Sequence, residues 1–498
     1  FFAKGRKSRH STKNEDTMHF RKVSKTIKAN ISGIGGSGQR LQVESVPVED
    51  NVNKVEVNNN TYNNIGPLQS QDSHIFISVR EPWAWVIEGV CTQNNGGLST
   101  ITRVASAQDL PSGKLASLAT FAAASNPNSA KGNRRRSQRN NTVATDAKCT
   151  LRVEVVSNTI TNNNNNTRPW KLEVFHCTSQ AFDGLDDKDE LARTLKRCRC
   201  EELDLSPPSQ LINWDVTKEE CLNLVGDSLP CLSKQTKDGF TPIAVLKEPM
   251  GSRGTGVFFV RDVDEIHSII EEHRQRAVSE EGFLDKLIAQ KGRIPSWVLQ
   301  AEVKPCLLIR DRRKFHIRTY VVCVETNVLL DEPFGGEEED LMKTFVYNRH
   351  EIRIASESLP SPGEEGSGQR NREAHITETF DRKLLQDEPE LVERNLSTKV
   401  ESFVANAIEA VRPDIERRIA MSASALDGEN ENSRGCMVLP HKFAIAGLDL
   451  MVTENDRIYL LEANVNPAAP PPETVANEFQ SHLVGFFRDT MELVTSRR

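Results

Sequence analysis

Two acidic residues near the C-terminal end of the chain have the spacing of metal ligands on a β-hairpin. Residues 443–467 read as two apolar strands folded about a turn at 455–456. A two-residue loop there predicts that Asp449 faces Glu462, with the two carboxylates about 5 Å apart. Asn464 lies on the same face, about 7 Å further along the strand. Like charges placed opposite each other destabilise a sheet unless a cation lies between them, and Mg²⁺ prefers oxygen ligands of this kind.

The alternative interpretation of this hairpin is an acidic surface whose carboxylates face water. Free carboxylates would be costly on a covered strand pair. Covered strands are indicated by apolar residues on both faces, namely Ile445, Leu448, Leu450, Met451, Leu460 and Leu461.

A glycine-rich segment upstream has the composition of a phosphate-binding loop. Lys247 closes a buried strand within 241–249, and the sequence EPMGSRGTG follows it. Gly254 and Gly256 allow positive φ and close backbone approach, so that amide groups can point at phosphate oxygens. Lys247 and Arg253 add positive charge. The order of residues is not that of a Walker loop, and alone the segment reads equally well as a hairpin turn. Combined with the acidic hairpin, it favours nucleotide binding.

The elements that must position these residues are mostly strands. Apolar patterning predicts a central sheet of mainly antiparallel strands and an α+β fold class. The expected strands lie at 74–80, 172–177, 241–249, 297–303, 306–309 and 314–325, followed by a short hairpin over 343–355. The expected helices lie at 187–199, 263–276, 396–420 and 473–495.

Composition indicates that only part of the chain folds. The 498 residues are 37% hydrophobic and 6% aromatic. Residues 1–72 lack periodicity and are predicted to form a disordered tail. Residues 73–230 are predicted to form a smaller N-terminal α/β subdomain with disordered inserts at about 105–148 and 158–168. Residues 231–495 are predicted to form the catalytic core, with polar inserts at 356–373 and 425–435.

Charge and cysteine usage restrict the class of protein. The net charge of −7 argues against general nucleic-acid binding. The ten cysteines include no CxxC pair, which fits reduced thiols in the cytoplasm. No apolar run approaches the roughly 20 residues that span a bilayer, so no membrane partner is expected. Since the sequence begins with Phe1 rather than Met, we expect a fragment or a processed product.

Several motifs, taken in order, resemble those of the tubulin-tyrosine ligase-like family. They are LKEPMGSRGTGV, VLQAEVKPCLLIRDRRKFHIRTYVV, VYNRHEIRIA, AHITETF, GLDLMV and YLLEANVNP, and they fall within residues 210–490. That family belongs to the ATP-grasp superfamily of carboxylate-amine ligases. The resemblance therefore implies an ATP-grasp fold for the core, with ATP and Mg²⁺ as cofactors.

The resemblance also implies roles for individual residues at the nucleotide. Lys247 and Arg253, with the backbone at Gly254 and Gly256, would contact the ATP phosphates. Gln300 and Val303 would border the adenine, and Lys314 would lie beside the nucleotide.

At the reacting groups, Arg318 would lie by the acyl phosphate, and Arg353 would hold the substrate carboxylate or the transferred phosphate. Asp449, Glu462 and Asn464 would hold Mg²⁺, with Glu462 required for catalysis.

Two positions depart from the family pattern. His316 stands where the family usually has Asp, and Glu378 stands where it has Asn. Neither change touches Lys247 or the three expected metal ligands. The departures raise an alternative hypothesis, in which the chain is a catalytically impaired pseudoenzyme that binds a cytoskeletal partner.

The function implied is an ATP-dependent ligase that adds a free amino acid to tubulin, by tyrosination, glutamylation or glycylation. The expected partner is tubulin or another protein with an acidic tail, for which the basic run 310–314 offers a surface. A solvated strand end explains that run equally well, and a ligase with a non-tubulin acceptor is a further alternative. The expected location is the cytoplasm, on microtubules or in cilia or flagella. Because the chain ends at Arg498 soon after the last helix, an initiating ligase is expected rather than a chain-elongating one.

Overall fold

The fold described below is that of a computed structural model. It describes residues 20–22, 73–79, 83, 86–87, 99–104, 151–157, 171–198, 203–228, 244–249, 254–279, 283, 285, 288, 292–326, 341–359, 372–375, 377, 381–427 and 441–495. Within this part of the chain, no helix is long and apolar enough to cross a membrane.

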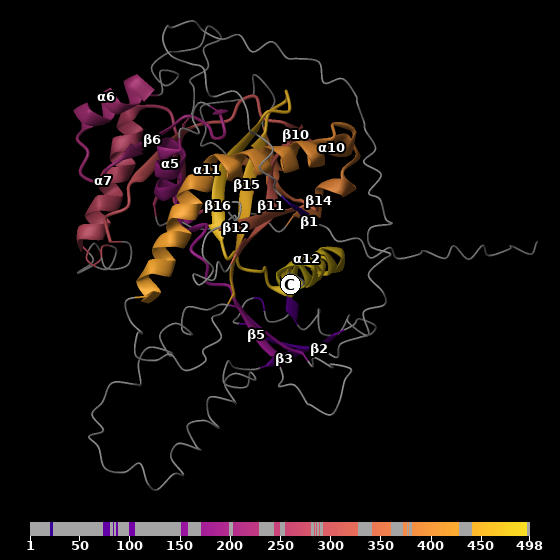
Figure 1. Ribbon diagram of the computed structural model, residues 1–498. Coiled ribbons are helices and arrows are strands. Elements are labelled where there is room, and N and C mark those ends of the chain that lie inside the picture. The colour runs from indigo at the N-terminus through magenta and orange to yellow at the C-terminus, as the bar shows by residue number, and fades with distance from the viewer. Residues whose placement is uncertain are drawn as a thin grey trace, which may run out of the picture.

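A large sheet forms the centre of the molecule (Figure 1). Its path runs β1-β12-β11-β15-β5-β4-β2-β3, with β10, β13, β14 and β16 pairing beside it. Its pairings are antiparallel except for β2 with β3 and the short contact of β15 with β5. The predicted α+β class with a largely antiparallel sheet is therefore confirmed. The strands are β1 (Phe20–Lys22), β2 (Ser73–Val79), β3 (Ser99–Val104), β4 (Leu151–Ser157), β5 (Lys171–His176), β10 (Leu308–Ile309), β11 (Arg313–Glu325), β12 (Met342–Tyr347), β13 (Glu351–Ser358), β14 (Arg382–Leu384), β15 (His441–Val452) and β16 (Ile458–Val465).

A second, four-stranded sheet has the order β6-β9-β7-β8. Its strands are β6 (Ser209–Ile212), β7 (Ala244–Lys247), β8 (Val257–Val260) and β9 (Trp297–Ala301), and all its pairings are antiparallel. Helices α6 (Lys218–Ser228) and α7 (Val263–Ser279) lie beside it in Figure 1. The small sheet includes β6, so it begins before the domain boundary at residue 230 that the sequence predicts.

The alternation of residues along β11 assigns the two faces of the large sheet. One face carries Phe315, Ile317 and Val321, which are buried in the same core as α11 (Leu396–Asp427). The other carries Val322 and Val324, which are buried in a separate core with α12 (Asn477–Thr495). Successive strand residues point to opposite faces, so the two long helices cover opposite sides of the sheet.

The long helix α11 buries one apolar stripe on that core. Its fully buried residues recur at intervals of three or four, as an amphipathic helix requires. They are Leu396, Val400, Val404, Ile408, Val411, Ile415 and Ile419. The shorter helices are α4 (Asp183–Asp186), α5 (Lys188–Arg197), α9 (Arg372–His375) and α10 (Pro389–Glu393), with 3-10 turns at Leu385–Asp387 and Pro472–Thr474.

The expected hairpin over 343–355 is wrong. Both β12 and β13 pair antiparallel with β11, along the same edge and one after the other. Between these pairings, two residues of β11 (319–320) face four residues (347–350) of the other strand. The 13 residues of β11 are long enough to pair with both segments, so the chain continues past this irregularity instead of turning back.

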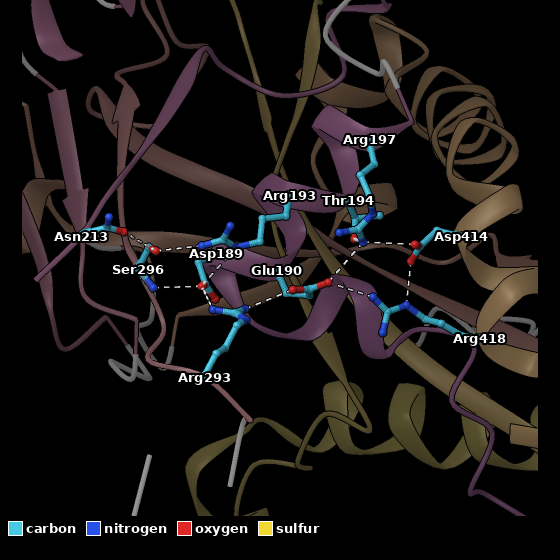
Figure 2. Close-up of polar contacts among 10 residues, drawn as sticks. All are labelled: Asp189, Glu190, Arg193, Thr194, Arg197, Asn213, Arg293, Ser296, Asp414 and Arg418. Carbon is cyan, nitrogen blue, oxygen red and sulfur yellow. Dashed lines mark hydrogen bonds and ion pairs between the residues drawn. The ribbon is translucent and has the colours of Figure 1, made fainter. Parts of the chain in front are cut away.

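A polar network on α5 joins the two sheets (Figure 2). Asp189, which is 1% exposed, accepts a hydrogen bond from Arg293 and one of 2.9 Å from the backbone N–H of Ser296, directly before β9. Glu190 on the same helix pairs with Arg418 of α11 at 2.9 Å. Since α11 packs on the large sheet, α5 is tied to both sheets and sets how they face each other.

The structure describes only part of the N-terminal region, so it tests only some of the predictions made there. Residues 20–22 form strand β1 at the edge of β12, which differs from the tail expected over 1–72. Strands β2 to β5 continue the large sheet through β15 instead of forming a sheet of their own. The inserts predicted at 105–148 and 158–168 lie outside the described residues. The insert predicted at 356–373 overlaps β13 and α9, and that at 425–435 overlaps the end of α11.

Candidate functional site

Polar side chains gather on one half of the α12-facing side of β11. They are Lys314, His316, Arg318 and Tyr320, all at most 5% exposed. Further along the same face the residues become apolar, at Val322 and Val324. The polar half marks the site, and the apolar half is the part that packs in the core with α12.

The hairpin of β15 and β16 places Asp449 opposite Glu462, as predicted. The predicted two-residue loop is wrong, because the N–H of Thr453 donates to the carbonyl of Arg457 at 2.8 Å. The loop therefore has three residues, and its last, Asp456, has a φ of 60°. A three-residue loop closed by a left-handed residue is a common hairpin connection.

The carboxylate pairing survives because a bulge offsets the longer loop. Between Asp449 and Leu450 the register shifts, so that Leu450 faces Leu460 while Asp449 still faces Glu462. Leu461 is the extra residue. The longer loop and the bulge shift the strand register by one residue in opposite directions, so Asp449 still faces Glu462.

The bulge also connects the hairpin to the small sheet. The Nζ of Lys247, at the end of β7, donates to the carbonyl oxygen of Leu461 at 3.1 Å. Burial lowers the pKa of Lys247 to about 8, although the negative charge of Glu462 acts to raise it. The lysine that was predicted to bind phosphate therefore reaches across to the predicted metal ligands.

Asp449 lies in a strongly positive environment. Arg318, its cross-strand neighbour, donates to both carboxylate oxygens, with Nη2 at 2.7 Å from Oδ2. The Nε2 of His316 lies 3.3 Å from Oδ1. Burial acts to raise the pKa of Asp449, but the charges of Arg318 and His316 outweigh it and hold that pKa well below its usual range. The carboxylate is therefore ionised.

The residues of the hairpin fit a magnesium ion that is shared with nucleotide phosphates. The side-chain amide of Asn464 donates to Asp449 Oδ2 at 3.2 Å, so its oxygen is turned elsewhere and can serve as a ligand. Glu462 is half-buried on the same face. Two carboxylates and one amide oxygen are the ligand types that Mg²⁺ prefers, with water and phosphate completing its shell. Arg318 engages both oxygens of Asp449, so Asp449 would have to exchange a hydrogen bond to that arginine for the ion. The described residues contain no group of three His, Cys, Asp or Glu side chains that could hold a metal.

The glycine loop is described only at its end. Gly254 and Gly256 have φ angles of 71° and 69°, the left-handed conformation predicted for them. The carbonyl of Gly256 accepts from the N–H of Glu248 at 2.7 Å, which closes the loop between β7 and β8. Arg253 lies outside the described residues, as does Glu378.

The residues expected to border the adenine, Gln300 and Val303, lie along β9 and its continuation. Gln300 is 6% exposed and faces Val245 of β7, on the same side of the small sheet as Lys247. Val303 is also buried, at 6% exposed. The sequence does not single out the carboxylate of Glu302, which lies between these two residues in the chain.

Glu302 holds two lysines in place. Lys314 donates to Glu302 at 2.7 Å and lies 2.8 Å from His375 Nδ1, while Lys304 pairs with Glu302 at 3.1 Å. Burial acts to raise the pKa of Glu302, and the charges of Lys314 and Lys304 lower it below its usual value. The signal in the sequence was a single acidic residue within the apolar run 297–303.

Arg353 lies on β13, opposite His316 of β11. Its Nη2 is 3.4 Å from Glu351 on the same strand face. Arg318 and Arg353 thus lie on one face of the sheet, and each contacts a buried carboxylate.

The basic run 310–314 is engaged with acidic residues of the chain itself. Arg310 pairs with Glu388, Arg313 pairs with Asp381 at 2.9 Å, and Lys314 turns inward to Glu302. These contacts leave the run a weaker surface for an acidic tail than its composition indicates.

Comparison with known proteins identifies the family of the chain. The profile of the tubulin-tyrosine ligase family matches residues 188–494, more than half of the chain. No curated protein matches the sequence. One solved structure that is similar is the C-terminal domain of K. lactis Pby1, described as an ATP-grasp enzyme interacting with the mRNA decapping enzyme Dcp2. It is 15% identical, covers 62% of this chain and 72% of that domain, and has a TM-score of 0.37.

The matched range contains every residue that the sequence assigns to the site, from Lys247 to Asn464. It begins at α5, the helix that ties the two sheets together, and ends within α12. The resemblance drawn from the sequence motifs is therefore confirmed, and the chain belongs to the tubulin-tyrosine ligase family.

Proposed function

We propose that this chain is an ATP- and Mg²⁺-dependent carboxylate-amine ligase that adds an amino acid to the acidic tail of tubulin. One observation carries the proposal. Lys247 of the small sheet reaches the bulge at Leu461, beside the opposed carboxylates of Asp449 and Glu462. A cation from one sheet and acidic ligands from the other meet at one point, as the binding of a metal–triphosphate requires.

The reaction has two steps. A carboxylate is a poor electrophile, so its oxygen first attacks the γ-phosphorus of ATP, and ADP leaves. The acyl phosphate that forms is then attacked by the amine of the second substrate. The amide bond forms, the C–O bond to phosphate breaks, and phosphate leaves with the proton balance completed by solvent.

The chain supplies charge and position more than covalent chemistry. Asp449, Glu462 and Asn464 would hold Mg²⁺, which would offset charge on the phosphates when bound. Lys247 and Lys314 would contact the phosphates. Both lysines are at most 8% exposed, so their charges act in a site with little competing water.

Arg318 and Arg353 would stabilise the acyl phosphate. Arg318 is held beside Asp449 by two hydrogen bonds, so its charge already lies next to the proposed Mg²⁺ ligands before substrate binds. Both arginines are 4% exposed, which favours exclusion of water from a hydrolysable intermediate.

The acceptor and the amino acid are proposed from the family alone. Tubulin is the acceptor suggested by the family name, and tyrosine, glutamate and glycine are the candidate amino acids. Location on microtubules in the cytoplasm, or in cilia or flagella, follows from that acceptor.

A second candidate function is a pseudoenzyme that binds a cytoskeletal partner. His316 favours it, because an imidazole lies 3.3 Å from Asp449 where the family usually has a carboxylate. The imidazole lies beside the carboxylate that would bind Mg²⁺. A ligase acting on another acidic protein is the third candidate.

The test is incubation with labelled ATP, Mg²⁺, tubulin and each candidate amino acid. Incorporation into tubulin supports the proposal, and absence of nucleotide binding leaves the pseudoenzyme. ATP turnover without labelled tubulin indicates another acceptor.

A matched pair of variants tests the metal assignment. Glu462→Gln should abolish transfer with the fold intact, because it removes one ligand charge. Glu454→Gln, at an exposed position in the loop of the same hairpin, should leave transfer unchanged. Full activity in Glu462→Gln would refute the assignment.

A further inference from the structure

A buried carboxylate that the proposed reaction does not use lies beside the site. Glu351, the first residue of β13, is 0% exposed. It faces Arg318 of β11 because the register shift between β12 and β13 places it there. Burying an ionised carboxylate is costly unless it is paired and hydrogen-bonded, so its surroundings must compensate.

The contacts of Glu351 come from three elements. The hydroxyl of Tyr320 on β11 donates to Oε1 at 2.6 Å. Arg353 Nη2 lies 3.4 Å from Oε2, and His482 Nε2 of α12 lies 3.8 Å from Oε1. The carboxylate is therefore held by Tyr320 on one oxygen and faces Arg353 with the other.

The charges around Glu351 explain why it is needed. Arg353 lies directly opposite Arg382 of β14. Like charges facing each other across two strands destabilise the pair. Burial acts to raise the pKa of Glu351, but the charge of Arg353, followed by that of His482, lowers it below its usual value. Glu351 is thus the anion that keeps Arg353 in place.

Each of the two arginines of the site contacts a different carboxylate. Asp449 holds Arg318 through two hydrogen bonds, whereas Glu351 holds Arg353 through one longer contact. Arg353 thus has a carboxylate partner separate from the one that holds Arg318.

We propose that Glu351 is a positioning residue for Arg353, which its carboxylate orients toward the substrate anion while Tyr320 fixes the carboxylate. The role rests on the proposed ligase function. Helix α12 supports the arrangement, because Phe486 stacks on Tyr320 with ring centroids 4.5 Å apart.

The kinetic test compares Glu351→Gln with Glu357→Gln, an exposed position on the same strand. Glu351→Gln keeps the shape of the side chain and an oxygen that accepts from the Tyr320 hydroxyl, but it removes the negative charge. Losing a charge-assisted contact should raise KM for the acceptor about tenfold, with KM for ATP within about twofold. Glu357→Gln should change neither. An equal rise in both KM values, or no change in either, would overturn the proposal.

A double-mutant cycle tests the contact without requiring transfer activity. If Glu351 and Arg353 act as a pair, the loss of stability in Glu351→Gln/Arg353→Gln is smaller than the sum of the two single losses. Additive losses would overturn the positioning role. If wild-type protein transfers no amino acid to any acceptor, the proposed function fails while this cycle still decides the role of Glu351.

A second variant covers the case in which Glu351→Gln does not fold. Tyr320→Phe keeps both charges and the stacking on Phe486, and it removes only the hydrogen bond to Glu351. A rise of about threefold in the same KM supports the proposal, since a neutral donor contributes less than a charge. An unchanged KM contradicts it.

Discussion

Gly447 gives Arg318 the space to reach Asp449, and Gly447→Ala removes that space. A Cβ atom at this position would lie 2.8 Å from the Cδ and 3.1 Å from the Nη1 of Arg318. Carbon atoms pack at about 3.5–4.0 Å, so the arginine must move by about 1 Å. The neighbouring strands β11 and β15 are buried and paired over eight residues, so the backbone cannot relieve the contact.

The magnitude follows from the overlap. Overpacking a buried site costs about 1–3 kcal/mol, and Gly447→Ala is expected within that range. A misplacement of about 1 Å in a catalytic group lowers rates about 100-fold. Transfer activity should therefore fall much more than stability, provided that Arg318 acts at the reacting groups.

The assay combines denaturant unfolding with ATP-dependent transfer, and Gly485→Ala is the control. At Gly485 of α12 an added Cβ would meet only Tyr347 Oη at 3.8 Å, an ordinary contact. Because alanine favours helix over glycine, this control should gain about 0.5–1 kcal/mol and keep its activity. Unchanged stability and activity in Gly447→Ala would refute the close approach and the role built on it.

Two further variants test the charges that join the sheets. Lys247→Met should stabilise the nucleotide-free protein by about 3 kcal/mol below pH 8, because burial lowers the pKa of Lys247 from 10.5 to about 8. In the unfolded state Lys247 keeps its proton up to its ordinary pKa of 10.5, so the gain in stability from Lys247→Met should shrink between pH 8 and 10.5. The variant should also lose ATP binding. A gain that persists above that range would contradict this reasoning. Asp189→Asn should cost about 1–3 kcal/mol in denaturant unfolding, since Arg293 and Ser296 lose a charged acceptor. Asp264→Asn, which breaks an exposed pair, should cost less than about 1 kcal/mol, and equal losses would refute the α5 network.

The sequence predicts the elements of the core well where periodicity is strong. The helix at 187–199, the buried strand ending at Lys247 and the long strand from Lys314 are all present. It fails where a strand changes partner or register. A break at 347–350 reads as a hairpin turn, because local composition does not reveal that β11 is long enough to pair with both segments.

The residue types of the candidate site are a more secure guide than the predicted geometry of the hairpin. Asp449 faces Glu462, although the loop has three residues and a bulge restores the register. The sequence does not single out Glu302, which directly follows β9, or Glu351, which is the first residue of β13. Lys314, the partner of Glu302, comes from another strand, so only the tertiary structure shows that contact, whereas Arg353 lies two residues beyond Glu351 on the same strand face.

Two irregularities of the large sheet lie at the site, and each supplies something that a regular ladder would not. The bulge at Leu461 turns a carbonyl toward Lys247 and so links the small sheet to the hairpin. The register shift before β13 places Glu351 opposite Arg318 and next to Arg353. Bulges re-aim side chains and interrupt pairing beside functional sites. Because the cations are already held by carboxylates, a substrate anion that binds as we propose would exchange one partner for another with little reorganisation of the backbone, and preorganised charge of this kind contributes to catalysis.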